Sequence, residues 1–297
     1  MLGSWLKLIR ANFLLLTPVV YSLGIASLLY DGIPIDAVDA ALALVASILS
    51  HMSVNVLNNY FDYKSGIDLK SRKTPFSGGV DVLARGEISP RGALALGLTS
   101  GLTAAAIGAY YMQKCPKLIG AIVAYAAACV TLYTPVLSHV PALSEVVAGT
   151  GFSLMCLWAY VVQARALSST IASLYVFSSI LVGVLLLLNE FPDMEVDKEA
   201  GRRHTVVLLG RGGAARVYAA LVAAAYITLI AAVAARILPL AALLALATAP
   251  LAVDSSRRVL ASPDSFESML QAMARNLAVV LLSIALASTG LSAAALL

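Results

Sequence analysis

The sequence contains nine apolar stretches, each close to the length of about 20 residues that a helix needs to cross the hydrocarbon core of a bilayer. They cover residues 12–30, 40–60, 92–112, 118–137, 143–163, 170–190, 214–235, 237–253 and 273–296. Hydrophobic residues make up 60% of the chain and charged residues 12%. The mean hydropathy of +0.89 lies outside the range of soluble globular proteins. We therefore expect an all-α, polytopic membrane protein with nine transmembrane helices.

Positive charge is distributed unevenly over the connections between these stretches. With a cytoplasmic N-terminus, one side of the membrane carries every Lys and Arg except Lys114, Lys117, Arg165 and Arg236. The positive-inside rule then predicts that the N-terminus is cytoplasmic and the C-terminus outside. A count of eight or ten spans would spoil this segregation. We expect a multi-pass protein of the cell membrane whose loops 61–91 and 191–213, which follow the polar motifs described next, face the cytoplasm.

Two polar motifs follow apolar stretches at the predicted cytoplasmic side. The first runs from Asn55 to Asp68 (NVLNNYFDYKSGID), and the second from Asn189 to Asp197 (NEFPDMEVD). The spacing Asn58-x3-Asp62 in the first is repeated in the second as an Asn followed by an Asp four residues later. Carboxylates near hydrocarbon are costly and seldom lack a partner or a task.

The repeated motif predicts an internal duplication within one domain, residues 1–297. Spans one to four would form the first copy, about residues 1–137 with a cytoplasmic loop at 61–91. Spans five to eight would form the second copy, about residues 138–253 with a loop at 191–213. An even number of spans separates the copies, so they share one orientation, and helix 273–296 would be an extra, peripheral helix. The expected arrangement is a bundle around a central cavity.

The four motif carboxylates would repel one another unless a cation lay between them. On a helix, Asp193 and Asp197 lie on one face, and Gly66 is expected to break the helix after Asp62 so that Asp68 can fold back. Carboxylate and amide oxygens suit Mg²⁺, which binds through a few carboxylates and substrate phosphate oxygens. The basic residues just beyond each motif suit the remaining negative charge of a diphosphate. The alternative is that these are only membrane-boundary charges at helix ends. Duplication together with the basic residues favours a site for a magnesium diphosphate.

Several segments resemble the UbiA-type intramembrane prenyltransferase superfamily. They are the two motifs with their continuations, NNYFDYKSGID before SRKTPFSGG and NEFPDMEVDKEAGRRHTVVLLG, and the segments Tyr133-Thr-Pro135 and Tyr160-Val-Val-Gln163. The resemblance covers nearly the whole chain and is strongest to the 1,4-dihydroxy-2-naphthoate branch. Two positions depart from the family pattern. Asn59 stands where an Asp is usual, and in members with Asp-x3-Asp in the first motif the second Asp would fall on Gly66.

The resemblance implies Mg²⁺-dependent transfer of a polyprenyl group from polyprenyl diphosphate to an aromatic acceptor, such as 1,4-dihydroxy-2-naphthoate or 4-hydroxybenzoate, with release of diphosphate. The implied catalytic carboxylates are Asp62, Asp68, Asp193 and Asp197, which would bind metal together with Asn58 and Asn189. The implied diphosphate-binding residues are Asn58, Asn59, Arg72, Lys73, Asn189, Lys198, Arg202 and Arg203. Further candidates for the substrate pocket are Arg10, Asn12, Asn55, Tyr133, Tyr160 and Gln163.

Two other functions stay open at this stage. The acceptor could instead be geranylgeranylglyceryl phosphate, which would make the reaction a step of ether-lipid synthesis. From another class, a small-molecule transporter also has repeats with polar groups within the membrane. The expected partners are polyprenyl diphosphate, the acceptor and membrane lipid; we expect neither a nucleic acid nor a protein partner.

Overall fold

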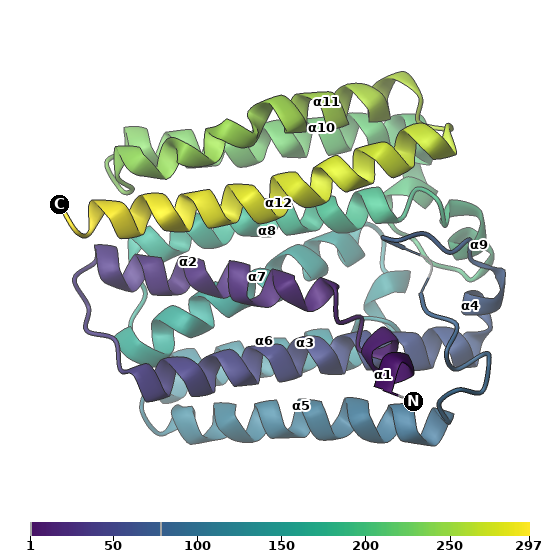
Figure 1. The fold of residues 1–297 in the computed structure, drawn as a ribbon, viewed down its shortest axis with the longest axis horizontal. Coiled ribbons are helices and arrows are strands. Elements are labelled where there is room, and N and C mark those ends of the chain that lie inside the picture. Colours follow the sequence, from purple (N-terminus) through teal and green to yellow (C-terminus); the bar gives the residue numbers. More distant parts are fainter. Residues whose placement is uncertain (1, 78) are drawn as a thin grey trace.

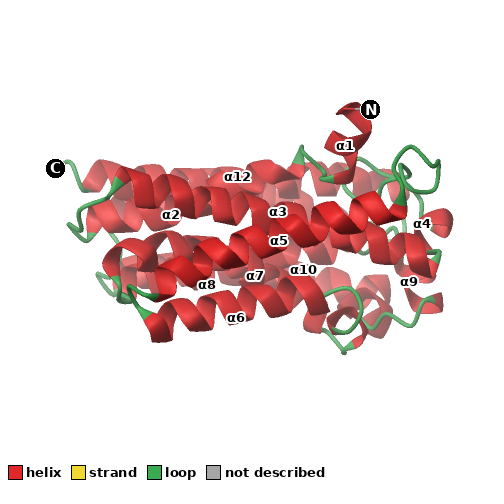
Figure 2. Cartoon of the chain, turned by 90° about the horizontal axis from the view of Figure 1, so that it is seen from below, coloured by secondary structure: helices red, strands yellow, loops and turns green. Residues whose placement is uncertain are grey.

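The computed structural model describes residues 2–77 and 79–297, apart from the side chains of Asp68 and Leu69. Every regular element in these residues is helical, and the long helices lie side by side in a layered bundle (Figure 1). Seen after a rotation of 90°, the long helices again run along one common direction (Figure 2). The expected all-α fold class is confirmed.

Within the part of the chain that the structure describes, eight helical segments are long and apolar enough to cross a membrane, judged by length and composition. They are η1 with α2 (Phe13–Leu15 and Leu16–Tyr30), α3 (Ala37–Ser65), α5 (Pro90–Met112), α7 (Leu143–Ala164), α8 (Ser169–Asn189), α10 (Thr205–Ala234), η3 with α11 (Leu240–Thr248 and Ala249–Ala261) and α12 (Phe266–Ala294). A further apolar helix, α6 (Pro116–Leu132), has 17 residues and falls short of this length. The count of nine spans is therefore not confirmed.

The remaining elements are short. They are α1 (Leu2–Leu8), α4 (Ile67–Lys70), η2 (Leu137–His139) and α9 (Met194–Glu199). Helix α4 overlaps the end of the first motif and α9 overlaps the end of the second. Figure 1 shows both at the same end of the bundle. We call this the motif end; the C-terminus lies at the opposite end.

Local sequence fixes where α3, the helix of the first motif, begins and ends. The Asp36 side chain caps its start by accepting hydrogen bonds from the backbone N–H groups of Val38 and Asp39. Gly66 ends it with φ of 79°, a left-handed conformation that favours glycine. The helix therefore breaks at Gly66, as the sequence predicted, and Asp62 lies in its last turn.

The most buried of the membrane-spanning helices is α7, which packs against α2, α3, α6 and α8. Small residues allow its close approach to α8. A Cβ atom built on Gly149 would lie 2.3 Å from the Ser179 carbonyl oxygen and 3.1 Å from the Gly183 nitrogen. Such contacts suit helices that associate in lipid by close backbone packing.

The last helix, α12, corrects one expectation. The sequence predicts a peripheral helix at residues 273–296, but α12 packs against α2, α8, α11 and η3. Gly290 allows its approach to η3, since a Cβ there would lie 2.1 Å from the Ala241 carbonyl oxygen. This helix therefore joins the first and last parts of the bundle.

The contact between α7 and α8 predicts that Gly149→Ala destabilises the protein. The added methyl group meets backbone atoms, which cannot move aside without separating the helices, and overpacking of this kind costs about 1–3 kcal/mol. Gly120→Ala is the matched control, because its Cβ would meet only the flexible end of Met112 at 3.4 Å. Thermal denaturation in detergent should show a lower midpoint for Gly149→Ala alone. Equal midpoints for both variants would contradict the packing argument.

Candidate active site

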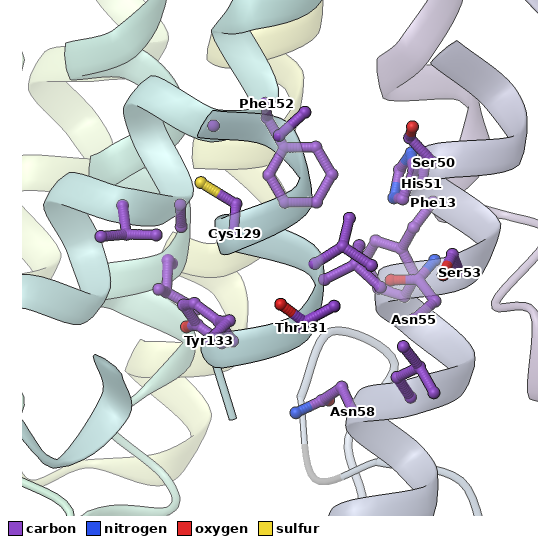
Figure 3. A pocket seen from close by; sticks show the side chains of 18 of the residues that line it. Phe13, Ser50, His51, Ser53, Asn55, Asn58, Cys129, Thr131, Tyr133 and Phe152 are labelled. Carbon is purple, nitrogen blue, oxygen red and sulfur yellow. The ribbon is translucent and has the colours of Figure 1, made fainter. Parts of the chain in front are cut away.

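A cavity of about 460 Å³ begins at the motif end and extends into the bundle between α3, α5, α6, α7 and α8. Its lining changes character along its length. Figure 3 shows Asn55 and Asn58 of α3 on one side, with Thr131 and Tyr133, from the end of α6, across from them. Further from the motif end the lining is mostly apolar or small. The cavity thus joins a polar mouth to an apolar interior.

Arg202 connects the two motifs at this mouth. Its guanidinium group donates one very short hydrogen bond to Asp62 of the first motif. It donates a second, of 2.9 Å, from Nη1 to Oδ1 of Asp197 in the second motif. Only 16% of the Arg202 side chain is exposed. One carboxylate from each motif therefore lies beside the same positive charge, and the two motifs face each other as the sequence analysis expected.

The other oxygen of Asp197 contacts a buried histidine. His204 Nε2 lies 3.0 Å from Asp197 Oδ2, while its Nδ1 accepts a hydrogen bond of 3.4 Å from the Val207 N–H at the start of α10. Since Nδ1 is an acceptor there, Nε2 carries the proton and donates to Asp197. His204 therefore positions Asp197 from the side opposite Arg202.

Next to His204 lies a second acidic group. Glu190 is buried and accepts a hydrogen bond of 3.2 Å from the Ser144 hydroxyl. Burial and the nearby charge of Glu145 raise the pKa of Glu190 well above its ordinary value, which favours the neutral form. Both His204 and Glu190 line the cavity, and neither is among the residues predicted for the site. Glu190 lies within the second motif and His204 lies seven residues beyond it, so their position along the chain was the available signal.

The amides of the first motif hold the N-terminal segment. Arg10 donates from Nη2 to Asn58 Oδ1 at 3.2 Å and to Asn59 Oδ1 at 2.9 Å. The Asn59 amide in turn donates to the Leu8 carbonyl at 3.0 Å. Arg10 has φ of 52°, a strained conformation for a residue with a side chain. Arg10 and Asn58 line the cavity, whereas Asn59 faces the N-terminal segment.

Three acceptors of the second motif are left unsatisfied among the described residues. Asn189 Oδ1, Glu190 Oε2 and Asp193 Oδ1 are buried and make no hydrogen bond there, and all three residues line the cavity. A buried acceptor without a partner costs about 1–3 kcal/mol. Burial, and then the charge of Asp197, raise the pKa of Asp193 to about 7. A bound cation would give the unsatisfied oxygens a partner and would reduce the repulsion between Asp193 and Asp197.

The described side chains do not form a ready metal site. No group of three His, Cys, Asp or Glu residues is arranged to hold an ion within that part of the chain. Arg202 lies between Asp62 and Asp197, which accounts for their separation. The oxygen-rich set of carboxylates and amides fits a hard cation whose remaining ligands come from water or substrate.

Several predicted residues lie elsewhere. Asp68 belongs to the predicted set, but its side chain lies outside the described residues. The Arg72 guanidinium carbon lies 3.5 Å from the ring centre of Phe266, so this residue stacks on α12 and does not reach the cavity. Lys198, Arg203 and Asn12 are exposed and do not line it. Lys73 is close enough for its charge to lower the Asp193 pKa.

Tyr160 and Gln163 correct the predicted substrate pocket. The Tyr160 hydroxyl donates to Asp31 at 2.6 Å, and the Gln163 amide donates to the Asp36 carbonyl at 2.9 Å. Asp31 and Asp36 belong to the connection between α2 and α3, at the end of the bundle opposite the motifs. Neither residue lines the cavity that holds the motif residues, because α7 runs away from the motif end before it reaches them.

The fold and the site define a polytopic helical protein whose two aspartate motifs meet at the mouth of an apolar cavity. The sequence profile of the UbiA prenyltransferase family matches residues 16–277. The chain belongs to this family.

Comparison with a curated relative gives a partial match. The chain is 29% identical over 191 residues to 1,4-dihydroxy-2-naphthoate octaprenyltransferase of Bacillus subtilis (strain 168). The aligned region covers 63% of this chain and spans 60% of that relative's length.

Solved structures share the fold. A UbiA homolog from Aeropyrum pernix K1 has a TM-score of 0.69 at 20% identity, over 90% of this chain and 95% of its own. A structure of digeranylgeranylglyceryl phosphate synthase has a TM-score of 0.67 at 16% identity, over 98% of this chain and 99% of its own. A UbiA homolog from Archaeoglobus fulgidus bound to GPP and Mg²⁺ has a TM-score of 0.62 at 18% identity, over 97% of this chain and 99% of its own.

The Arg202 bridge predicts that Arg202→Gln destabilises the metal-free protein. Loss of one partner leaves two buried carboxylates uncompensated, which typically costs about 3–5 kcal/mol. Arg203→Gln is the control, because the Arg203 side chain is exposed and its backbone hydrogen bonds to Ser138 and Ala142 remain. We expect chelator-treated Arg202→Gln protein to melt at a lower temperature than the wild type, with Arg203→Gln unchanged. An unaltered midpoint for Arg202→Gln would contradict the bridge.

Proposed function

We propose that this chain transfers a prenyl group from a prenyl diphosphate to an acceptor inside the membrane, in a reaction that depends on Mg²⁺. The observation that carries the proposal is the meeting of Asp62 and Asp197, one from each motif, at the polar mouth of an apolar cavity. The mouth suits a diphosphate head, and the interior suits an isoprenoid tail. Membership of the UbiA family and the Bacillus subtilis relative support the same reaction.

The residues that would hold the metal are Asp62, Asp193 and Asp197, assisted by the amide oxygens of Asn58 and Asn189. Asp68 completes the proposed set on the strength of the sequence resemblance. When bound, Mg²⁺ supplies electrostatic stabilisation for the negative charge that develops on the departing diphosphate. The unsatisfied oxygens of Asn189 and Asp193 favour this assignment.

Arg202 would change partners when the substrate binds. A guanidinium group donates two parallel hydrogen bonds to a diphosphate as readily as to carboxylates. Release from Arg202 would free Asp62 and Asp197 to act as ligands, while the Arg202 charge stays beside the phosphate oxygens. Lys73, whose charge already acts on Asp193, would add to this stabilisation.

The apolar interior protects the prenyl group once its bond to diphosphate weakens. Phe152, Leu154 and Met155 of α7 line the cavity beyond its polar mouth. Excluding water from this region prevents capture of an allylic cation by hydrolysis. An electron-rich aromatic carbon of the acceptor would then form a carbon–carbon bond to the prenyl group at the boundary between the polar and apolar parts, with diphosphate as the leaving group. The same ring carbon would lose its proton, or its carboxyl group as CO2, to restore aromaticity.

We infer an aromatic acceptor, such as 1,4-dihydroxy-2-naphthoate or 4-hydroxybenzoate, from the Bacillus subtilis relative and from the motif resemblance. A transfer assay tests this inference directly. Protein in detergent is given radiolabelled geranylgeranyl diphosphate with 1,4-dihydroxy-2-naphthoate, 4-hydroxybenzoate or geranylgeranylglyceryl phosphate, with and without Mg²⁺. We expect a Mg²⁺-dependent product with an aromatic acceptor. Product with the glycerol phosphate alone would contradict the aromatic assignment, and absence of both product and diphosphate release would favour a transporter.

Isosteric variants test the proposed carboxylates. Asp62→Asn, Asp193→Asn and Asp197→Asn should each lower the transfer rate at least about a hundredfold, since each removes negative charge from the metal site. Glu195→Gln serves as the control, because Glu195 belongs to α9 beside these residues but its side chain is 68% exposed. Size-exclusion profiles should stay unchanged for all four variants. Full activity in any of the three Asp→Asn variants would remove that residue from the site.

A further inference from the structure

The far end of the cavity is closed mainly by one large side chain. On four of the surrounding helices, the lining residues furthest from the motif end are Ala46 of α3, Gly108 of α5, Ile122 of α6 and Trp158 of α7. Among these four, Trp158 has the largest side chain. It forms the floor of the cavity.

This floor is held firmly in place. The Trp158 side chain is buried and its indole N–H donates to the Ala43 carbonyl at 2.9 Å. The Tyr111 ring packs edge-on against it, with 5.6 Å between ring centres. Tyr111 is itself anchored by its hydroxyl, which donates to Asp39 Oδ1 at 3.0 Å. An indole fixed by a hydrogen bond and an aromatic contact does not swing aside at low cost.

The side wall beside the floor is closed as well. At Gly108 the helices α5 and α6 are in contact, since a Cβ there would lie 2.6 Å from Val123 Cγ2. Closer to the motif end the lining residues Leu98 and Leu102 of α5 keep 46% and 68% of their surface exposed. A chain that extends past Gly108 therefore enters a blind end.

The depth of the cavity corresponds to a definite tail length. Asp62 and Ala46 both line the cavity from α3, and the helical rise places them about 24 Å apart. An extended isoprenoid advances by about 5 Å per unit with ordinary carbon–carbon bond lengths. The space from the carboxylates to the floor is therefore about five units long. A metal-bound diphosphate head beside the carboxylates would take up about one unit of this length, which leaves room for a tail of about four units.

We propose that Trp158 determines prenyl chain length by acting as this floor, so that the enzyme prefers a geranylgeranyl donor to longer ones. The inference rests on the proposed prenyl transfer and adds the donor's length to it. Trp158 is a specificity-determining residue, distant from the reacting atoms. Its removal should change which donor is used while the carboxylate site stays intact.

The test compares kcat/KM for farnesyl, geranylgeranyl and hexaprenyl diphosphate in wild type and Trp158→Ala. We expect the wild type to favour geranylgeranyl over hexaprenyl diphosphate. Trp158→Ala should raise the hexaprenyl-to-geranylgeranyl ratio by about tenfold or more, since even one methylene in an apolar pocket alters selectivity by that order. Leu157→Ala is the matched control on the same helix, because Leu157 does not line the cavity. It should keep the wild-type ratio.

A second variant should act in the opposite direction. Ala46→Leu places a larger side chain at the far end of the cavity and shortens it, so preference should shift towards farnesyl diphosphate. This variant keeps the inference testable if Trp158→Ala does not fold. If both variants fold and keep the wild-type ratios of kcat/KM between donors, Trp158 does not determine prenyl chain length. That result would indicate that the tail leaves past Leu98 and Leu102. Loss of transfer with every donor in the wild type would instead refute the proposed function.

Discussion

The ion pairs of Arg202 with Asp62 and Asp197 are the interaction on which the site depends. Buried carboxylates require compensation, and a single guanidinium group compensates one from each motif. Because Asp62 ends a long helix and Asp197 lies in the short helix α9, the pairs also fix the second-motif segment against α3. His204 adds a contact to Asp197 from the other side. The two motifs are therefore held against each other before any ligand binds, and Arg202 would leave the two carboxylates when metal and diphosphate enter.

Helix termination places these groups at one end of the bundle. Gly66 ends α3 one turn after Asp62, and Gly201, with φ of 78°, reverses the chain after α9. This turn lets the Arg202 N–H donate to the Asp197 carbonyl at 2.9 Å while its side chain spans both motifs. Beyond the motifs the apolar parts of α3, α5, α6, α7 and α8 surround the cavity. Charge at one end and hydrocarbon along the rest give a site suited to an amphiphilic substrate.

The sequence predicted the parts of this arrangement that depend on local pattern. Hydropathy predicted an all-α membrane protein, and the repeated Asn-x3-Asp spacing predicted that Asp62 and the second motif belong to one site. The predictions that failed concern contacts between segments that are distant in the sequence. Arg72 follows the first motif closely, yet it stacks on Phe266 of α12. Tyr160 was assigned to the substrate pocket although the direction of α7 carries it to the opposite end. No local pattern indicates either contact.

The central claim, that the two motifs bind one metal diphosphate between them, is tested most directly by electron paramagnetic resonance of Mn²⁺, which accepts the same oxygen ligands as Mg²⁺. Wild-type protein in detergent is titrated with Mn²⁺ in the presence and absence of a non-hydrolysable geranylgeranyl thiodiphosphate. We predict tight Mn²⁺ binding that requires the diphosphate and is lost equally in Asp62→Asn and Asp197→Asn, one variant from each motif. Unchanged binding in either variant would contradict a metal diphosphate site shared by the two motifs.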